Sequence, residues 1–355
     1  MKKEAMDFMM EYLNASSPTG FELEVQKLWT KYLKKSVDEV GIDRFNNAYV
    51  KICGTGNADL LKKKVVIEAH ADEIGWFVNY ISDKGFIHVI KLGGSDIAIA
   101  RSKRVNIMTD KGIVRGLFGI PAIHVRNTVG EKVPKVEELF IDIGCSTPKE
   151  VEKLGVKIGC PILFDDKAEI LNKNFIVGKA LDDKIGGFVN AEVMKNLSKL
   201  KKKLKCDVIA VNSSQEEIGL RGAEMMAYKI KPDLAICIDV THETNHPEMK
   251  KEKHGDISFD GCVLTISPQV DIRLNKHLED VAKKYKIKIQ HQVAGRSTGT
   301  DTDSFAYCRG GIPSVLISMP LRYMHTTVEM MKLKTVEETI TLLTKALTEG
   351  INEIF

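Results

Sequence analysis

Two adjacent glutamates, Glu216 and Glu217, are the residues whose types and spacing point most directly to chemistry. They follow the apolar run at residues 208–211 and the serines Ser213 and Ser214. Two neighbouring carboxylates at the end of a buried strand repel each other unless a cation lies between them. We therefore expect an irregular turn beside a metal ion. The residues alone leave a second interpretation open, the first turn of a helix, where the helix dipole favours glutamate and serine caps the helix.

Further residues of the types that bind metals lie where apolar strands are expected to end. They are His70 and Asp72 after residues 65–67, Asp182 in the motif at residues 178–183, Asp239 after residues 236–238, and His325 in the motif at residues 320–325. Ligands of open α/β sheets bind outside the carboxyl ends of the strands. Carboxylates gathered with imidazoles in one water-poor cleft are unstable without cations, so this set predicts a metal site.

The chemistry of these ligands narrows the choice of metal. Imidazole nitrogen with carboxylate oxygen suits zinc, cobalt or manganese, and the absence of thiolates from the set argues against a structural zinc finger. A carboxylate shared by two ions about 3.5 to 4 Å apart would give each ion three protein ligands and leave room for a bridging water. The sequence therefore predicts a dinuclear hydrolase, and spacing alone leaves open which carboxylate bridges.

The elements that must position these residues alternate between strands and helices. Strand candidates lie at residues 65–67, 208–211, 234–238, 263–266 and 314–317, and helix candidates at residues 4–13, 22–34, 183–197 and 275–285. This alternation predicts an α/β fold with three layers, a mostly parallel sheet with helices on both faces. A last helix is expected near the C-terminus, with Thr335 and Glu338 as its capping box.

The middle of the chain has a different pattern of apolar residues. From residue 76 to about residue 164, short β-branched segments are separated by turns, which predicts a small β-rich domain inserted into the α/β domain. We place the catalytic domain at residues 1–75 and 170–355, and the inserted domain at residues 76–169. One helix is expected there, capped by Ser146 or Thr147 with Pro148 in its first turn. Residues 124–135 lack periodicity and predict a mobile loop.

Composition sets the broad class of protein. The chain has 355 residues and a net charge of +4 from 52 basic and 48 acidic residues. This net charge is too small to indicate binding to nucleic acid or to an anionic membrane. The N-terminus lacks the apolar core of a signal peptide, and no stretch is long and apolar enough to span a bilayer. The 7 cysteines are scattered without a Cys-x-x-Cys pair. We therefore expect a cytoplasmic protein.

The motifs together carry a family resemblance. In chain order, these motifs are His70-Ala71-Asp72 and residues 178–183, 213–223, 238–239, 299–301 and 322–325. They closely resemble the tetrahedral (TET) metalloaminopeptidases, a group also known as glutamyl aminopeptidases or "cellulase M". The resemblance covers essentially the whole chain. It implies a zinc-exopeptidase-like fold in which the inserted barrel or PDZ-like domain serves for dimerisation.

The resemblance implies roles for the candidate ligands. Asp182 would bridge the two ions, His70 and Asp239 would complete one metal site, and Glu217 and His325 would complete the other. Zinc or cobalt is the expected metal, with manganese possible.

The same resemblance implies roles for two other acids. Glu216 would be the general base that takes a proton from the metal-bridging water and delivers it to the leaving amine. Asp72 would orient and polarise the imidazole of His70. The peptide bond between Asp182 and Asp183 would be cis, as in related enzymes.

The expected function is removal of N-terminal residues from short peptides by a homo-oligomer, a dodecamer built from dimers. Three other functions remain open: a dinuclear deacylase of N-acyl amino acids, a metal-free endoglucanase, and an inactive shell protein. The sequence does not reveal the preferred N-terminal residue. The roles of His242 and His246 also stay open, as does the resemblance of residues 295–303, with Thr300 and Asp301, to a substrate-lining loop.

Overall fold

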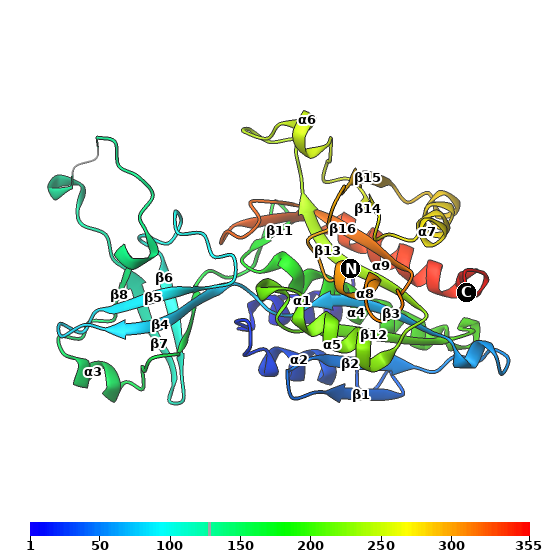
Figure 1. Cartoon of the computed structure of the whole chain (residues 1–355), viewed down its shortest axis with the longest axis horizontal. Coiled ribbons are helices and arrows are strands. Elements are labelled where there is room, and N and C mark those ends of the chain that lie inside the picture. The colour runs from blue at the N-terminus through cyan, green and yellow to red at the C-terminus, as the bar shows by residue number, and fades with distance from the viewer. Residues whose placement is uncertain (127–128) are drawn as a thin grey trace.

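The computed structural model describes residues 1–126 and 129–355. Figure 1 shows two parts, a β-sheet covered by helices and a barrel that projects from it. We call the sheet with its helices the α/β body, and strands β4 to β9 with their connections the barrel. The predicted fold class, a layered α/β sheet with an inserted β-rich domain, is confirmed.

In the described part of the chain, the α/β body holds one sheet of 11 strands. Its four central strands, β12 (Asp207–Ser213), β3 (Lys64–His70), β13 (Leu234–His242) and β16 (Ser314–Arg322), are neighbours in this order and parallel. Antiparallel strands extend the sheet on both sides: β1 (Glu39–Ile42), β2 (Ala48–Ile52), β17 (Glu329–Lys332), β11 (Phe175–Gly178) and β10 (Glu169–Leu171). Strand β14 (Cys262–Ile266) pairs with β16, and β15 (Ile289–Val293) pairs with β14.

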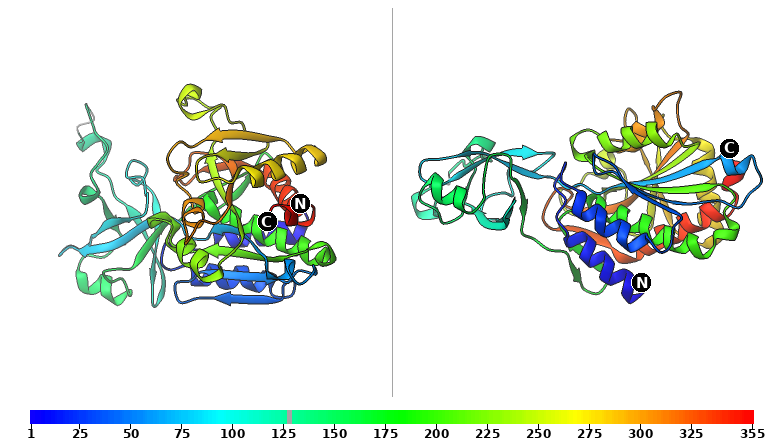
Figure 2. Two further views of the ribbon diagram at one scale, coloured as in Figure 1. Left: turned by 45° about the vertical axis from the view of Figure 1, so that its right-hand side comes forward. Right: turned by 90° about the horizontal axis from the view of Figure 1, so that it is seen from below.

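Helices cover both faces of the sheet, as Figure 2 shows, because the central strands are apolar on both faces. Val65 and Ile67 of β3 belong to one hydrophobic cluster, and Val66 between them belongs to another. The first cluster includes side chains of α1 (Lys3–Asn14), α2 (Leu23–Leu33), α4 (Leu181–Lys199), α7 (Ile272–Tyr285) and α9 (Leu333–Thr348). The second includes side chains of α5 (Arg221–Ile230) and α8 (Thr302–Ala306).

The barrel closes in the strand order β4, β5, β8, β7, β6, β9. Its strands are β4 (Gly75–Ile81), β5 (Ile87–Leu92), β6 (Arg104–Thr109), β7 (Gly112–Phe118), β8 (Phe140–Asp142) and β9 (Pro161–Phe164). Helix α3 (Pro148–Lys153) lies where the sequence predicts it, and the Thr147 side chain accepts a hydrogen bond from the backbone N–H of Glu150. Since Trp76, Ile107 and Ile141 pack in a separate cluster, the barrel has a hydrophobic core of its own.

Two predictions about local structure need comment. The capping box of the last helix is wrong: β17 runs directly into α9, Lys332 is the N-cap, and the Thr335 hydroxyl donates to the backbone carbonyl of Phe259. Of the loop predicted at residues 124–135, residues 124 and 125 belong to a short 3-10 helix, η2 (Ile123–Val125), and residues 129–135 contain no helix or strand. Residues 127 and 128 lie outside the described residues, and the mobility of the loop stays a prediction. Within the described residues, no helix is both long and apolar enough to cross a membrane.

Candidate metal centre

The predicted ligands meet at the carboxyl edge of the four central strands. His70 is the last residue of β3, Asp239 lies within β13, three residues before its end, and His325 follows β16. Asp182 lies at the start of α4, next to Asp183, to which a cis peptide bond joins it. Parallel strands bring these ends together although the residues are far apart in the sequence.

The two adjacent glutamates follow the same edge. Glu216 and Glu217 begin a single 3-10 turn, η5 (Glu216–Ile218), and Gln215 before it has a left-handed backbone with φ of 58°. The structure therefore has an irregular turn, and α5 begins only at Arg221. Of the two interpretations that the sequence leaves open, the irregular turn is confirmed.

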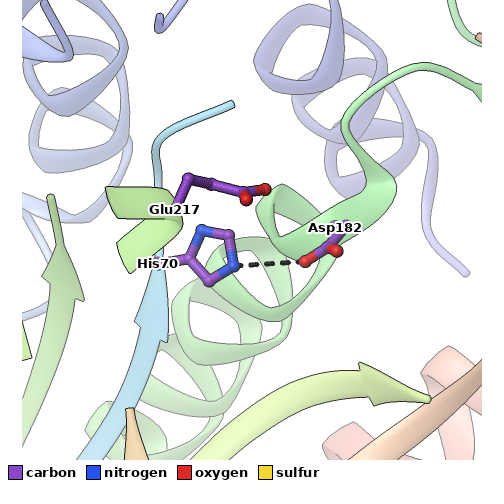
Figure 3. Close-up of side chains that lie close together, drawn as sticks. All are labelled: His70, Asp182 and Glu217. Carbon is purple, nitrogen blue, oxygen red and sulfur yellow. Dashed lines mark hydrogen bonds and ion pairs between the residues drawn. The ribbon is translucent and has the colours of Figure 1, made fainter. Parts of the chain in front are cut away.

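Asp182 lies between the two histidines. Its Oδ1 is 3.1 Å from Nε2 of His70, the contact drawn in Figure 3, and its Oδ2 is 3.3 Å from Nε2 of His325. Nε2 of His325 is also 3.6 Å from Oε1 of Glu217. Each carboxylate oxygen of Asp182 thus faces a different imidazole, so this carboxylate lies where it could be shared between two ions.

Two groups of potential ligand atoms can be distinguished around His70. One comprises His70, Asp182 and Glu217, and the other His70, Asp183 and Asp239, with all ligand atoms of each group within 4.8 Å of one another. Asp239 therefore lies beside His70, as the sequence predicts. Asp183, to which the sequence gave no role, joins the second group, and its Oδ2 is buried without a hydrogen-bond partner.

The electrostatics of the centre fit bound cations. Burial, reinforced by the charges of neighbouring carboxylates, raises the pKa of Asp239 to about 8. Burial, followed by repulsion from Asp301 and Asp239, raises the pKa of Glu216 to about 9. The pKa of Glu217 also lies well above its usual value, for the same reasons. Divalent cations would compensate the charge that these buried carboxylates otherwise cannot carry, so the residues present fit two metal ions.

Glu216 lies beside the cluster. Its Oε2 is 3.9 Å from Nε2 of His70, and its side chain is only 12% exposed. A carboxylate at this place borders the cavity that opens onto the centre, so it can reach a water or a substrate atom held there.

Asp72 makes hydrogen bonds besides the contact with His70 that was predicted from the sequence. Its Oδ1 is 3.5 Å from Nδ1 of His70, a distance too long for a strong hydrogen bond. At the same time, Asp72 accepts hydrogen bonds from the backbone N–H groups of Glu216 at 3.0 Å and Glu217 at 3.2 Å, and from the Thr19 hydroxyl at 2.8 Å. Asp72 therefore holds the glutamate turn in place while it faces His70.

Glu329 holds the other side of the centre, and the sequence analysis missed it. Its carboxylate accepts the backbone N–H groups of Leu181 at 2.7 Å, Asp182 at 3.2 Å and His325 at 2.8 Å. Burial raises its pKa well above the usual value. The only feature of the sequence that could have indicated Glu329 is its position as a single acidic residue before two methionines, at the start of β17 (Glu329–Lys332).

A second buried layer lies below the ligands. The Ser213 hydroxyl oxygen is 2.7 Å from Oε1 of Glu68 and 2.8 Å from Oδ2 of Asp301. Glu68 is another acid that the sequence analysis missed, and Asp301 lies below the cavity, where it contacts Ser213 and does not line the surface. This layer ties β3 and β12 to the loop before α8.

A cavity of about 560 Å³ opens onto the centre. Besides the metal-binding residues, its walls include Thr241, His242, Gln292, Val293, Thr298 and Thr300. His242 and Thr300, whose roles the sequence leaves open, thus face the cavity. His246 lies outside the lining, with its ring 5.5 Å from the ring of Tyr323.

Known proteins resemble this chain over nearly its whole length. Residues 51–342 match the profile of the M42 glutamyl aminopeptidases. The lysyl aminopeptidase of Pyrococcus furiosus is 31% identical over 97% of each chain. A TET aminopeptidase from a marine-sediment Thaumarchaeota archaeon superposes with a TM-score of 0.90 at 29% identity, over 98% of this chain and 96% of that one. The TET1 peptidase of Pyrococcus horikoshii, described as assembling into a tetrahedron or a large octahedral shell, has a TM-score of 0.81 at 26% identity, over 97% of this chain and 99% of that one.

Proposed function

Because the chain belongs to the M42 glutamyl aminopeptidase family, we propose that it removes N-terminal residues from peptides at the metal centre of the α/β body. Family membership makes it a peptide hydrolase of the aminopeptidase type that depends on divalent metals. The assignment of individual residues and metals is our proposal. The observation that carries it is the position of Asp182, with one carboxylate oxygen toward His70 and the other toward His325.

We assign two divalent ions to the centre, and zinc or cobalt, with manganese as a third choice, fits its nitrogen and oxygen ligands. Asp182 would bridge them, His70 and Asp239 would hold one, and Glu217 and His325 the other, with Asp183 close to the first. Bound ions of this kind polarise a carbonyl oxygen and lower the pKa of water.

Glu216 would act as the general base. Its carboxylate lies at the edge of the cavity, where it can accept a proton from the attacking water and return that proton to the nitrogen of the leaving amine. Asp72 keeps the Glu216 backbone in place through its hydrogen bond to the N–H group. Asp72 would therefore position the base directly, and its place 3.5 Å from Nδ1 of His70 supports a role in orienting that imidazole as well.

The test is the hydrolysis of chromogenic amino-acid amides by chelated protein, before and after zinc, cobalt or manganese is added. We expect metal-dependent cleavage that stops when the α-amine of the substrate is acetylated. Cleavage that requires the acetyl group would identify a deacylase, and cleavage of a β-glucan without metal would identify an endoglucanase. Two bound ions without any cleavage would indicate an inactive shell.

We also propose that the protein is a cytoplasmic dodecamer, built from dimers in which two chains pair through the inserted domain, residues 76–169. The likeness to the tetrahedral TET1 peptidase supports this assembly. The exposed side chains Ile113, Leu117 and Ile158 on the barrel, 60%, 49% and 68% exposed, supply apolar surface for it. Light scattering would test the assembly, with a mass of twelve chains expected and a stable monomer contradicting it.

A further inference from the structure

The cavity beside the metal centre extends past the ligands toward the end of β13, the end of β15 and the loop at residues 298–300. The wall that these segments form is the part of the cavity that contains none of the metal ligands. We call it the distal wall, and it includes Thr241, Gln292, Val293, Thr298 and Thr300. A substrate with its scissile bond at the metal centre would extend one side chain into the remaining space.

The polar groups of the distal wall are largely engaged with one another. The Thr241 hydroxyl donates to Oε1 of Gln292 at 2.6 Å, and Nε2 of Gln292 donates to the Thr265 hydroxyl at 2.8 Å. The amide of Gln292 is thereby held in one orientation, with its oxygen accepting one hydrogen bond and its nitrogen donating another. This side of the cavity has little capacity left to bind a charged group.

The loop side of the distal wall has the same character. The Thr298 hydroxyl donates to Oδ1 of Asp303 at 2.8 Å, and the Thr300 hydroxyl donates to the Thr302 hydroxyl at 3.1 Å. Asp303 also accepts the backbone N–H groups of Thr298 and Gly299, and it does not line the cavity. Its negative charge is therefore used within the loop and is not offered to a substrate.

The remaining lining residues add no cation and no acid outside the metal centre. Leu220, Val293, Ala294 and Met324 are apolar. Among the described residues around the cavity, there is no lysine or arginine, and every carboxylate belongs to the metal centre described above. Burial and repulsion by His254 lower the pKa of His242 below its usual value, which disfavours a positive charge on this side chain. The free hydroxyl of Ser318 is likewise neutral.

We propose that the distal wall is the subsite for the side chain of the N-terminal residue and that it selects uncharged side chains, such as leucine and methionine, over lysine and glutamate. Transfer of a charged side chain from water to this wall without an ionic or hydrogen-bond partner costs more free energy than its contacts with the wall provide. An apolar side chain loses nothing and buries its surface against Val293, Ala294 and Met324. This inference rests on the proposed aminopeptidase function.

The first test compares kcat/KM for the amides of leucine, methionine, lysine and glutamate with the metal-loaded, full-length protein. We expect leucine or methionine to exceed both charged residues by at least about tenfold. Lysine or glutamate as the best substrate would overturn the assignment of the subsite but leave the aminopeptidase function intact. Cleavage of none of the four would overturn the proposed function, and the subsite with it.

A second test places a charge on the distal wall. Gln292→Glu keeps the size of the side chain and the oxygen that accepts from Thr241. We expect the ratio of kcat/KM for lysine to that for leucine to rise by about tenfold or more, because the lysine ammonium gains a partner. Val293→Glu, at a side chain that is 79% exposed, should raise the same ratio without loss of core packing.

The matched control is Lys288→Gln, which lowers the net charge by the same amount just before β15 and outside the cavity. This control should leave the lysine to leucine ratio unchanged. If both glutamate variants bind two metal ions per chain and still show the wild-type ratio, the distal wall is not the subsite. A ratio that rises equally in the Lys288→Gln control would also overturn the proposal, because overall charge would then explain it.

Discussion

The interiors of the α/β body and the barrel differ in what they contain. The α/β body buries charged groups beside its hydrophobic core, among them Glu68, Asp72, Asp183, Lys184 and Glu329. In the described part of residues 75–164, Ser95 is the only polar side chain that is buried to the same degree. Apolar packing therefore stabilises the barrel interior, whereas part of the interior of the α/β body consists of charged groups around the metal centre in place of apolar side chains.

Buried charges in the α/β body are not isolated from one another. Lys184, fully buried, donates to Glu73 at 3.1 Å, and Glu73, which lies two residues before β4, also pairs with Lys179. Burial alone would raise the pKa of Glu73, but the positive charges of Lys179 and Lys184 outweigh this effect and lower the pKa to about 2. The buried charges of the α/β body therefore depend on their partners, and removing one partner should affect function before it affects the barrel.

The largest effect should come from Glu216→Gln. This change removes the carboxylate that accepts the proton but keeps the size of the side chain, and we expect kcat to fall by about 10²- to 10⁴-fold. Two metal ions should still bind, which elemental analysis of the purified variant would measure. Glu224→Gln, at an exposed glutamate of α5, is the control and should keep full activity. Wild-type turnover in Glu216→Gln would show that another group is the base.

Glu329→Gln should weaken the metal centre from outside the ligand set. The amide keeps one acceptor oxygen but cannot accept all three N–H groups of Leu181, Asp182 and His325. We expect metal affinity to fall by about 10- to 100-fold. A cobalt titration followed by visible absorption would measure the affinity and the geometry without turnover.

The control for this change is Glu353→Gln near the C-terminus, which should bind cobalt as the wild type does. Glu329→Asp, which restores a carboxylate on a shorter side chain, should recover part of the affinity. Unchanged cobalt binding in Glu329→Gln would show that the three hydrogen bonds do not position the ligands.

A pair of equal substitutions compares the two interiors directly. Ile141→Ala in the barrel and Ile317→Ala in β16 each remove a fully buried side chain, and each should cost about 2 to 5 kcal/mol of the free energy of unfolding. Only Ile317→Ala should also lower cobalt affinity, because β16 leads to His325. Denaturant unfolding and cobalt titration would measure the two effects. An equal loss of cobalt affinity in both variants would mean that the barrel and the metal centre are coupled.

The smallest effect concerns pH and the metal-free protein. The pKa values of Asp239 and Glu216, about 8 and about 9, lie above their usual values of 3.8 and 4.5. In the folded state these two groups therefore keep protons that the unfolded state releases, so their contribution to stability is complete below about pH 4 and is lost as the pH rises through about 8 to 9. Thermal unfolding of chelated protein should show a melting temperature that drops between pH 5 and 8 by roughly several degrees, and zinc should reduce this drop. A melting temperature of the chelated protein that rises over the same range would contradict the account.

The residues that meet at the candidate metal centre could be picked out in the sequence because most of them follow an apolar run that is typical of a buried strand. His70, Glu216 and Asp239 are of this kind, and the order of the motifs along the chain carried the family resemblance. The supporting acids were not predictable in the same way. Glu68 lies within a strand and Glu329 opens one, and in a single sequence an acid at such a place does not reveal which backbone N–H groups it will meet.

The distal wall shows the same limit. Gln292 belongs to β15, a strand that the sequence analysis did not predict, and its partner Thr241 is 51 residues away in the chain. The failed capping box of α9 has a related cause, since no loop separates β17 from the helix and the N-cap position falls on Lys332. Both features depend on tertiary contacts, which cannot be inferred from local patterns in the sequence.

The most direct test of the central claim is a metal titration of the chelated protein, with hydrolysis of a leucine amide and bound zinc measured at each step. We predict that activity appears with zinc and reaches its maximum at two ions per chain. Full activity at one ion per chain, or activity without any metal, would contradict the two-metal centre bridged by Asp182.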